Sequence, residues 1–383
     1  MLFTRLIGLS HSSTWNLLQT LRCPSAVLDL KFSPLNPSVL SVALSAGSIG
    51  FYILCTKPSP SDICPPLSLI NVTQIFAADS LITSLAFDPT SSFLATTQST
   101  GEVHLLRINQ HAQDLGYVTL QSDIHSHKPL EAWCVAFGAA PQTTTFADDQ
   151  ACTIYSGGDD SALLATSYDR SSTHSASGHQ GHTALKKLHG AGVVAILPLP
   201  VQDIVLTGSY DEHIRVINTA SKTVLAEARL GGGVWRLKHF DIPEHRRPWT
   251  LKRRKRRKEL KPDNDIRNAD DEDAHSTEAY LKVLCSCMHA GSRVIEVVQS
   301  PEGGWRVEIL AKFDFEGWEE RRLNYGSDVQ PRVAGVINGN GESETGRWCV
   351  STSFYDKLVC LWRFEEGEES KEGGKEAGVQ KGR

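Results

Sequence analysis

The stretch that decides the fold is residues 206–216, LTGSYDEHIRV. An apolar run ends in small residues, a tight turn follows around Asp211, and a second apolar run begins at Ile214. Short apolar runs on the two sides of a tight turn are typical of antiparallel strands. The stretch therefore predicts two paired strands joined by a short turn.

The same unit recurs along the chain. The first two copies open alike, with VLDLKFSP at 27–34 and ITSLAFDP at 82–89. Corresponding turns with Gly or Asp follow at 155–161, 206–216, 283–291 and 348–362. Because six segments fit one rule, the sequence predicts an all-β repeat fold of six blades. A seventh blade of divergent sequence stays open, since insertions make the spacing uneven.

These units resemble WD40 repeats, whose four-stranded blades carry Gly-His and Trp-Asp dipeptides. Here the dipeptides are degraded: His189 keeps the histidine, while 217–218 and 361–362 retain part of the closing pair. The resemblance implies one WD40-type β-propeller over residues 1–364. The stretch from Trp15 to Leu21 is expected to be the fourth strand of the last blade, because such a strand closes the ring and removes exposed edges.

Two charged segments are expected to be disordered, because blocks of like charge resist packing. One is an insertion at about 241–279, which holds KRRKRRK at 252–258 and DDED at 270–273; the other is the tail, 365–383. We interpret the basic run as a solvated loop. A nuclear-import or RNA-binding patch is the alternative.

Composition indicates a cytoplasmic protein. The formal net charge of -5 attracts neither nucleic acid nor an anionic membrane. Nine cysteines, several in apolar runs, favour a reduced compartment. Cys285 and Cys287 lack the second pair that a zinc site needs, and no apolar run is long enough to cross a bilayer. We therefore expect a monomer that binds no metal ion or cofactor and does not associate with a membrane.

Residues in register across the blades are the candidates for a binding face. The position after the first residue of the inner strand holds Leu28, Thr83, Trp133, Val194 and Trp235, and the position before the turn aspartate holds Asp159, Tyr210 and Tyr355. One end of the propeller would thus collect aromatic rings and carboxylates. Packing of the channel mouth explains the same residues, and both interpretations stay open.

Two further features point to chemistry near the fourth turn. Gly232 and Gly233 precede Trp235 in a glycine loop that is expected to shape the channel mouth. His213 stands where WD40 repeats usually have threonine, which makes it the preferred general base. Ser209, Asp211 and His189 match a buried structural network better than a hydrolase triad.

Four strings together resemble the diphthine methylesterase family of diphthamide synthesis: GSYDEHI at 208–214, GGVWRL at 232–237, CMHAG at 287–291 and SFYD at 353–356. Weaker matches at 131–133, 159–161 and 325–328 extend the resemblance over most of the chain, apart from the charged insertion and the tail. The missing tryptophan near Ile217 is a departure, but it lies outside these strings.

The resemblance implies hydrolysis of a methyl ester on the modified histidine of translation elongation factor 2. The modified side chain carries a trimethylammonium group, which aromatic faces attract. Candidate catalytic residues are His213, Asp211, Ser209 and Arg236; candidate substrate-binding residues are Trp133, Trp235, Tyr210, Tyr355, Asp356, Gly232 and Gly233. Arg236 or the glycine amides would stabilise the oxyanion, and Ser209 is the alternative to a water nucleophile. The competing function is a non-catalytic scaffold that recruits a protein partner.

Overall fold

The described part of the chain is built from β-strands alone. The computed structural model describes residues 3–9, 15–55, 66–109, 116–138, 152–168, 180–240, 252–255, 277–314, 323–330, 346–353, 355, 358–365 and 380–382. It divides into two compact units, Met1–Val205 and Leu206–Arg383.

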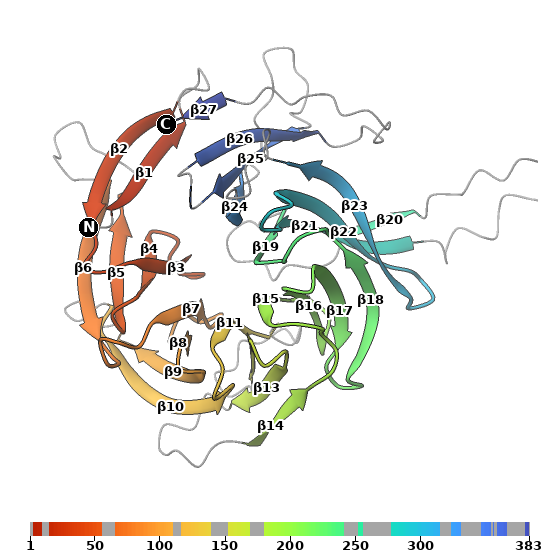
Figure 1. Ribbon diagram of the computed structural model, residues 1–383, viewed down its shortest axis with the longest axis horizontal. Helices are drawn as coiled ribbons and strands as arrows, with labels where there is room; N and C mark the ends of the chain where they lie inside the picture. Colours follow the sequence, from red (N-terminus) through yellow and green to blue (C-terminus); the bar gives the residue numbers. More distant parts are fainter. Residues whose placement is uncertain are drawn as a thin grey trace, which may run out of the picture. The chain divides into compact units, whose positions relative to one another are not determined.

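The first unit contains three four-stranded antiparallel sheets and a hairpin (Figure 1). The sheets are β3 (Val27–Phe32), β4 (Val39–Leu44), β5 (Ser48–Leu54) and β6 (Leu67–Gln74); β7 (Ile82–Phe87), β8 (Phe93–Gln98), β9 (Glu102–Ile108) and β10 (Val118–Ser126); and β11 (Ala132–Phe137), β12 (Cys152–Gly158), β13 (Leu163–Tyr168) and β14 (Gln180–Leu185). The hairpin is β1 (Phe3–Leu9) with β2 (Trp15–Arg22).

The remaining strands form three more sheets. A four-stranded sheet has the order β15 (Val193–Pro198), β16 (Ile204–Ser209), β17 (His213–Asn218) and β18 (Thr223–Arg229). The next is β19 (Arg236–His239), β21 (Thr277–Ser286), β22 (Ser292–Gln299) and β23 (Trp305–Phe313), with β20 (Lys252–Lys255) also paired to β21. The last is β24 (Asn324–Val329), β25 (Gly346–Ser353), β26 (Leu358–Glu365) and β27 (Gln380–Gly382).

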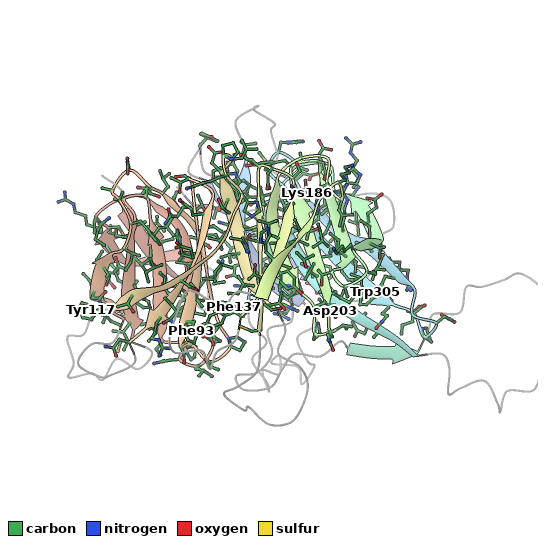
Figure 2. The ribbon with its side chains drawn as sticks, turned by 90° about the horizontal axis from the view of Figure 1, so that it is seen from below. Phe93, Tyr117, Phe137, Lys186, Asp203 and Trp305 are labelled. Atoms are coloured by element: carbon green, nitrogen blue, oxygen red, sulfur yellow. The ribbon has the colours of Figure 1, made fainter. Side chains whose placement is uncertain are left out.

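Six sheets in chain order are the blades of a WD40-type β-propeller, which confirms the predicted fold class and blade number. The fourth, outer strands of the first, second, fourth and fifth blades are β6, β10, β18 and β23. The sequence did not indicate β14, the outer strand of the third blade. In Figure 2, Tyr117 marks the residue just before β10, where half of its side chain is exposed.

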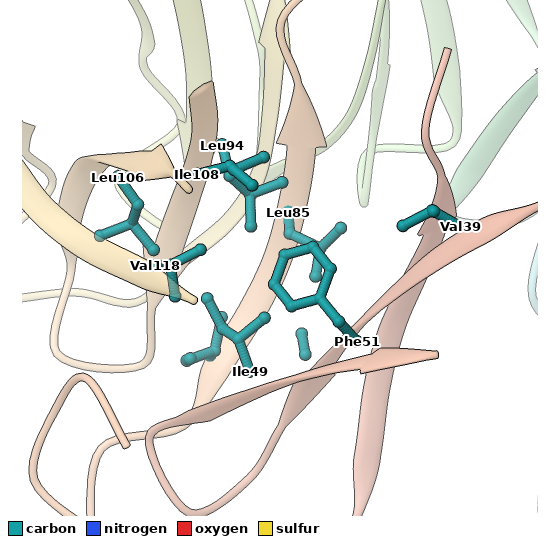
Figure 3. Close-up of a cluster of buried hydrophobic side chains, with 10 residues drawn as sticks. Val39, Ile49, Phe51, Leu85, Leu94, Leu106, Ile108 and Val118 are labelled. Carbon is teal, nitrogen blue, oxygen red and sulfur yellow. The ribbon is translucent and has the colours of Figure 1, made fainter. Parts of the chain in front are cut away.

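Apolar residues of neighbouring blades build the cores. Val39, Ile49 and Phe51 of the first blade pack with Leu85 and other buried residues of the second (Figure 3). In the second unit, Phe313 and Trp362 stack with ring centroids 5.0 Å apart. The second strands β4 and β16 are buried along their whole length, as expected for short continuous apolar runs.

A left-handed residue recurs at the turn between the second and third strands of five blades. Its members, with positive φ, are Gly47, Gly101, Ser161, Glu212 and Gly291. A side chain on Gly101 would strike the carbonyl oxygen of Leu130, so this glycine is needed for space as well as for backbone conformation. The repeated turn places the residues before it at equivalent positions in each blade.

The prediction that an N-terminal strand completes the sixth blade is wrong. The segment from Trp15 to Leu21 does not join the sixth blade: it lies in β2, which pairs with β1 in a separate two-stranded sheet, and the fourth strand of the sixth blade is β27. Gln19 explains the alternative position, because its side-chain amide both donates to and accepts from the backbone of Leu67, at 2.8 Å each way. The β2 strand is thereby tied to β6 of the first blade.

Parts of the predicted insertion form strands. Lys252–Lys255 is β20, paired with the first four residues of β21. The four-residue β19 covers only the far end of this ten-residue strand, so the rest of its edge is available to β20. Most of the remaining insertion, at 241–251 and 256–276, and most of the tail lie outside the described residues. No helix in the part of the chain that the structure describes is long and apolar enough to cross a membrane.

Candidate functional site

The glycine loop is packed against the turn of the next blade. A side chain on Gly232 would strike the carbonyl oxygen of Cys287, and one on Gly233 would lie 2.6 Å from the Met288 sulfur and 3.2 Å from the Tyr210 ring. Both glycines are buried. Close packing therefore requires glycine at both positions, and it brings Tyr210 and Met288 together.

Backbone hydrogen bonds fix this loop to the turn of the fourth blade. The Val234 amide donates to the Ser209 carbonyl at 3.0 Å, and the Leu230 amide donates to the Glu212 carbonyl at 2.8 Å. The Trp235 amide donates to the Ser286 carbonyl at 2.8 Å. The turn, the loop and the start of the fifth blade thus form one rigid support.

Aromatic side chains gather on this support. The Tyr210 and Trp235 ring centroids are 5.5 Å apart, and Tyr325 meets Trp235 edge to face at 5.1 Å and 76°. The Arg236 guanidinium lies 5.7 Å from the centroid of the Trp235 ring. Tyr355 lies close enough to Tyr325 to raise the pKa of its phenol, although burial is the larger cause. We call Tyr210, Trp235, Tyr325 and Tyr355 the aromatic group.

Tyr325 is a member of this group that the sequence did not select. Inner strands of four blades carry a β-bulge directly after their first paired residue, and Tyr325 is the extra residue in the sixth blade. The equivalent bulge residues are Leu28, Thr83 and Trp133. Extending the register rule to the sixth blade would have found Tyr325, because a bulge re-aims the side chain of its extra residue.

His213 is held by its own turn. Its Nδ1 lies 2.7 Å from the Asp211 carbonyl oxygen, which can only accept, so Nδ1 carries the proton and Nε2 is the basic nitrogen. About a third of the side chain is exposed. Among the described contacts, none joins this imidazole to the aromatic group.

The Asp211 carboxylate has a different partner. It accepts from the Arg215 guanidinium at 2.8 and 3.0 Å and from the His213 amide at 3.0 Å. Its side chain is mostly buried. The carboxylate therefore stabilises the turn, and the carbonyl group of Asp211, not its side chain, orients His213.

Ser209 is placed poorly for a nucleophile. Its side chain is fully buried, and its hydroxyl accepts from the Asp211 amide at 3.2 Å. His189 is buried too and belongs to the first unit. These positions agree with the structural interpretation of this trio.

A buried network of histidine, serine and aspartate is present at the third blade, although the sequence predicted such a network only at the fourth. His127 contacts Asp160 through Nδ1 at 2.8 Å and Ser156 through Nε2 at 2.7 Å, with the imidazole fully buried. Burial raises the pKa of Asp160, but the His127 hydrogen bond and charge outweigh it, so the pKa lies below its usual value. Ser156, His127 and Asp160 therefore form a buried structural network in the third blade.

Trp133 lies beside carboxylates. Burial raises the pKa of Asp159; the nearby Trp133 side chain opposes this effect, while Glu131 and Asp160 reinforce it. Trp133 belongs to the first unit and the aromatic group to the second, so its membership of a common cage stays a prediction. Asp356 lies outside the described residues.

The cysteines at 285 and 287 are buried thiols. Burial raises the pKa of Cys285 well above its ordinary value and that of Cys287 to about 12. Within the described ranges, no three His, Cys, Asp or Glu side chains are placed to hold a metal ion.

Comparison with known proteins finds several that are similar in sequence to this chain. Diphthine methyltransferase of Schizosaccharomyces pombe is 27% identical over 339 residues, which cover 88% of this chain and 78% of that protein. The chain is a relative of the diphthine methyltransferases. The Mus musculus protein of that name is 31% identical over 237 residues, which are 58% of this chain and 44% of its own length. The chain thus spans less than half of this mouse relative. No protein-family model matches.

Solved structures show the fold alone. A chain of the mitotic checkpoint complex aligns with 93% of this chain and 79% of its own length, at a TM-score of 0.53 and 14% identity. Chaetomium thermophilum Sqt1, bound to the N-terminus of ribosomal protein L10, aligns with 94% of this chain and 77% of its own, at 0.53 and 12%. At such low identity, neither protein carries its function to this chain.

Proposed function

We propose that the protein acts in diphthamide synthesis by hydrolysing the methyl ester of diphthine on elongation factor 2. Water adds to the ester carbonyl carbon, the bond from that carbon to the methoxy oxygen breaks, and a carboxylate, methanol and a proton result. The aromatic group carries this proposal. It combines three strings of the family resemblance at one place, and the relatives of the chain are named diphthine methyltransferase.

The aromatic group suits the cationic part of the substrate. A trimethylammonium group is attracted to the faces of tryptophan and tyrosine, at roughly 0.5–2 kcal/mol for each such contact. Arg236 already lies near the Trp235 ring, which indicates that this ring accepts a cation. The substrate cation would displace the guanidinium, which could then contact the ester carbonyl or the product carboxylate.

A base for water activation remains to be assigned. His213 has the correct tautomer, with Nε2 as acceptor, and it lies three residues from Tyr210 on the same turn. Its exposed edge is accessible to a protein substrate. We retain it as the general base, with Ser209 less favoured because its hydroxyl is buried.

The direct test mixes the purified protein with elongation factor 2 that bears methylated diphthine. We expect the factor to lose the methyl group and methanol to appear at substoichiometric protein concentration. A Trp235→Ala variant should lose most of this turnover, and Tyr117→Phe, far along the sequence and exposed, serves as the matched control. Unchanged factor after prolonged incubation would contradict the proposal.

A scaffold is the second candidate, and one observation favours it. The described contacts of His213 are with Asp211, and none of them reaches the aromatic group. If no general base acts there, the same aromatic surface would bind the modified side chain without chemistry. Stable binding of methylated factor with no release of methanol would support this candidate.

A further inference from the structure

Asn324 is a fully buried residue directly before the bulge residue Tyr325, and it has no role in the proposed hydrolysis. Its Nδ2 donates to the Gly291 carbonyl at 2.9 Å and to the Ser292 hydroxyl at 2.7 Å, and its Oδ1 accepts from the Gly326 amide at 3.2 Å. A carbonyl oxygen can only accept and a backbone amide can only donate, so these partners fix the orientation of the side-chain amide. One side chain therefore donates on one side and accepts on the other.

The acceptor side of Asn324 shapes the bulge. An asparagine oxygen that accepts from the backbone amide two residues ahead forms an Asx-turn, which constrains the backbone of the residue between them. That residue is Tyr325, whose ring meets Trp235 edge to face at 5.1 Å. Because a bulge re-aims the side chain of its extra residue, this turn determines where the Tyr325 ring points.

The donor side of Asn324 holds the turn that supports the glycine loop. The backbones of Asn324 and Met288 exchange two hydrogen bonds, at 3.0 and 3.1 Å, and the Asn324 side chain binds the Gly291 carbonyl, so both ends of this turn are bound to one residue. The Met288 sulfur in turn packs so closely on Gly233 that a side chain there would lie 2.6 Å from it. Since the loop leads into Trp235, Asn324 fixes the supports of both rings.

A buried cluster of serine hydroxyls adjoins Asn324. The Ser351 hydroxyl contacts Ser292 at 2.6 Å and Ser327 at 3.1 Å, and it accepts from the Trp362 indole at 2.9 Å. Within the part of the chain that the structure describes, this hydroxyl is linked to Asn324 through the other two serines. Ser351 therefore belongs to the same buried surroundings without shaping the bulge, which makes it a matched control.

We infer that Asn324 is a positioning residue for the aromatic group: it holds Tyr325 against Trp235 before the substrate arrives, so that the cationic group of the substrate meets two rings already in place. The inference rests on the proposed function. Rings that are ordered beforehand bind more tightly than mobile rings, because less conformational entropy is lost on binding. Asn324 is fully buried and does not reach the substrate, so its loss should weaken binding and leave the chemical step unchanged.

The test measures the dissociation constant, KM and kcat of the full chain with methylated elongation factor 2. Asn324→Ala removes both sides of the contact, and we expect the dissociation constant and KM to rise roughly 10-fold with kcat within about twofold. Asn324→Ser keeps a hydroxyl that can accept from the Gly326 amide, as serine does in related turns, so both constants should rise only about threefold. Ser351→Ala removes the acceptor of the buried Trp362 indole, so it should lower the unfolding temperature and leave both constants at the parent values.

A spectroscopic readout follows the position of the Tyr325 ring without any turnover. In protein labelled with meta-fluorotyrosine, the fluorine resonance of Tyr325 is assigned by its loss in Tyr325→Phe. We expect this resonance to move in Asn324→Ala, because the ring leaves Trp235, and to stay in place in Ser351→Ala.

These measurements decide the inference. An unmoved Tyr325 resonance in Asn324→Ala, an equal rise of KM in the Asn324 and Ser351 variants, or a loss confined to kcat overturns it. If Asn324→Ala does not fold, Asn324→Ser is compared with Ser351→Ala by the same measures. A parent that binds the methylated factor without releasing methanol contradicts the esterase proposal alone, because the dissociation constants still test Asn324. A parent that neither binds nor hydrolyses the factor overturns both.

Discussion

His213 shows how one side chain can be assigned a chemical role by its neighbours. A carbonyl oxygen accepts its Nδ1 proton, which leaves Nε2 as the base and excludes the opposite tautomer. The Asp211 carboxylate lies 3.6 Å from Nδ1, too far for the hydrogen bond of a triad, and it pairs with Arg215 at 2.8 Å. A single general base acting on water is therefore favoured over a relay.

The general-base assignment gives the first prediction. His213→Gln keeps a hydrogen-bonding side chain on the turn but cannot accept a proton, so kcat should fall roughly 10²- to 10⁴-fold. The thermal unfolding temperature should change little, because a third of the imidazole is exposed. Turnover of the variant at the parent rate would remove His213 from the base role.

The Asp160 carboxylate gives a pH prediction. Its pKa in the folded protein lies below the usual value of 3.8, chiefly because the bond to His127 outweighs the effect of burial. A lowered folded pKa contributes stability above pH 3.8, and this contribution is lost as the pH falls through the folded pKa. We therefore compare the free energy of unfolding of Asp160→Asn and of the parent by urea unfolding. As the pH is lowered from 6 to below 3.8, this free energy should fall less for the variant than for the parent.

The matched control for this prediction is Asp123→Asn. Asp123 also contacts a histidine, His104, but its side chain is 80% exposed. Exposed ion pairs contribute little to stability. An Asp160 variant with the same acid sensitivity as the Asp123 variant would contradict the account of the third-blade network.

At the scale of elements, the repeated turns predict how the blades respond to substitution. Gly101→Ala places a side chain at φ 90° against the Leu130 carbonyl oxygen, so it should destabilise the protein by at least about 1 kcal/mol. Ser161→Gly, at the equivalent turn with φ 59°, should change stability by less than about 1 kcal/mol, because relief of strain is offset by the flexibility of unfolded glycine. Denaturant midpoints measure both, and equal effects would contradict this account.

Most elements could be predicted from the sequence, because short apolar runs separated by Gly and Asp turns determine local strands. The third-blade outer strand was missed, since residues 180–185, QGHTAL, lack an apolar pattern. The Trp15 to Leu21 segment was correctly predicted to be a strand, but it pairs with β1 and not with the sixth blade. Its partner depends on Gln19 contacting the Leu67 backbone, and strand propensity does not determine such a contact.

The candidate site was only partly predictable. Tyr210 and Trp235 were selected by register, and the structure brings them together. Tyr325 was not selected, because the register rule was not extended to the inner strand of the sixth blade, where Tyr325 is the bulge residue. The packing of the glycine loop could not be predicted from the sequence: a side chain at 232 or 233 would collide with the Cys287 carbonyl oxygen or the Met288 sulfur.

At the scale of the whole molecule, the propeller supplies repeated turns, and three successive blades place an aromatic group where those turns meet. We propose that the aromatic group marks the place where the protein hydrolyses an ester. A scaffold with the same surface would bind the modified factor and leave its methyl group in place. A transferase would pass the methyl group to another acceptor.

Hydrolysis in water enriched in oxygen-18 separates these cases most directly. The account predicts that mass spectrometry finds one heavy oxygen in the new carboxylate of elongation factor 2 and none in the released methanol, because water attacks the carbonyl carbon. Loss of the methyl group without heavy oxygen in that carboxylate, or no loss at all, would contradict the account.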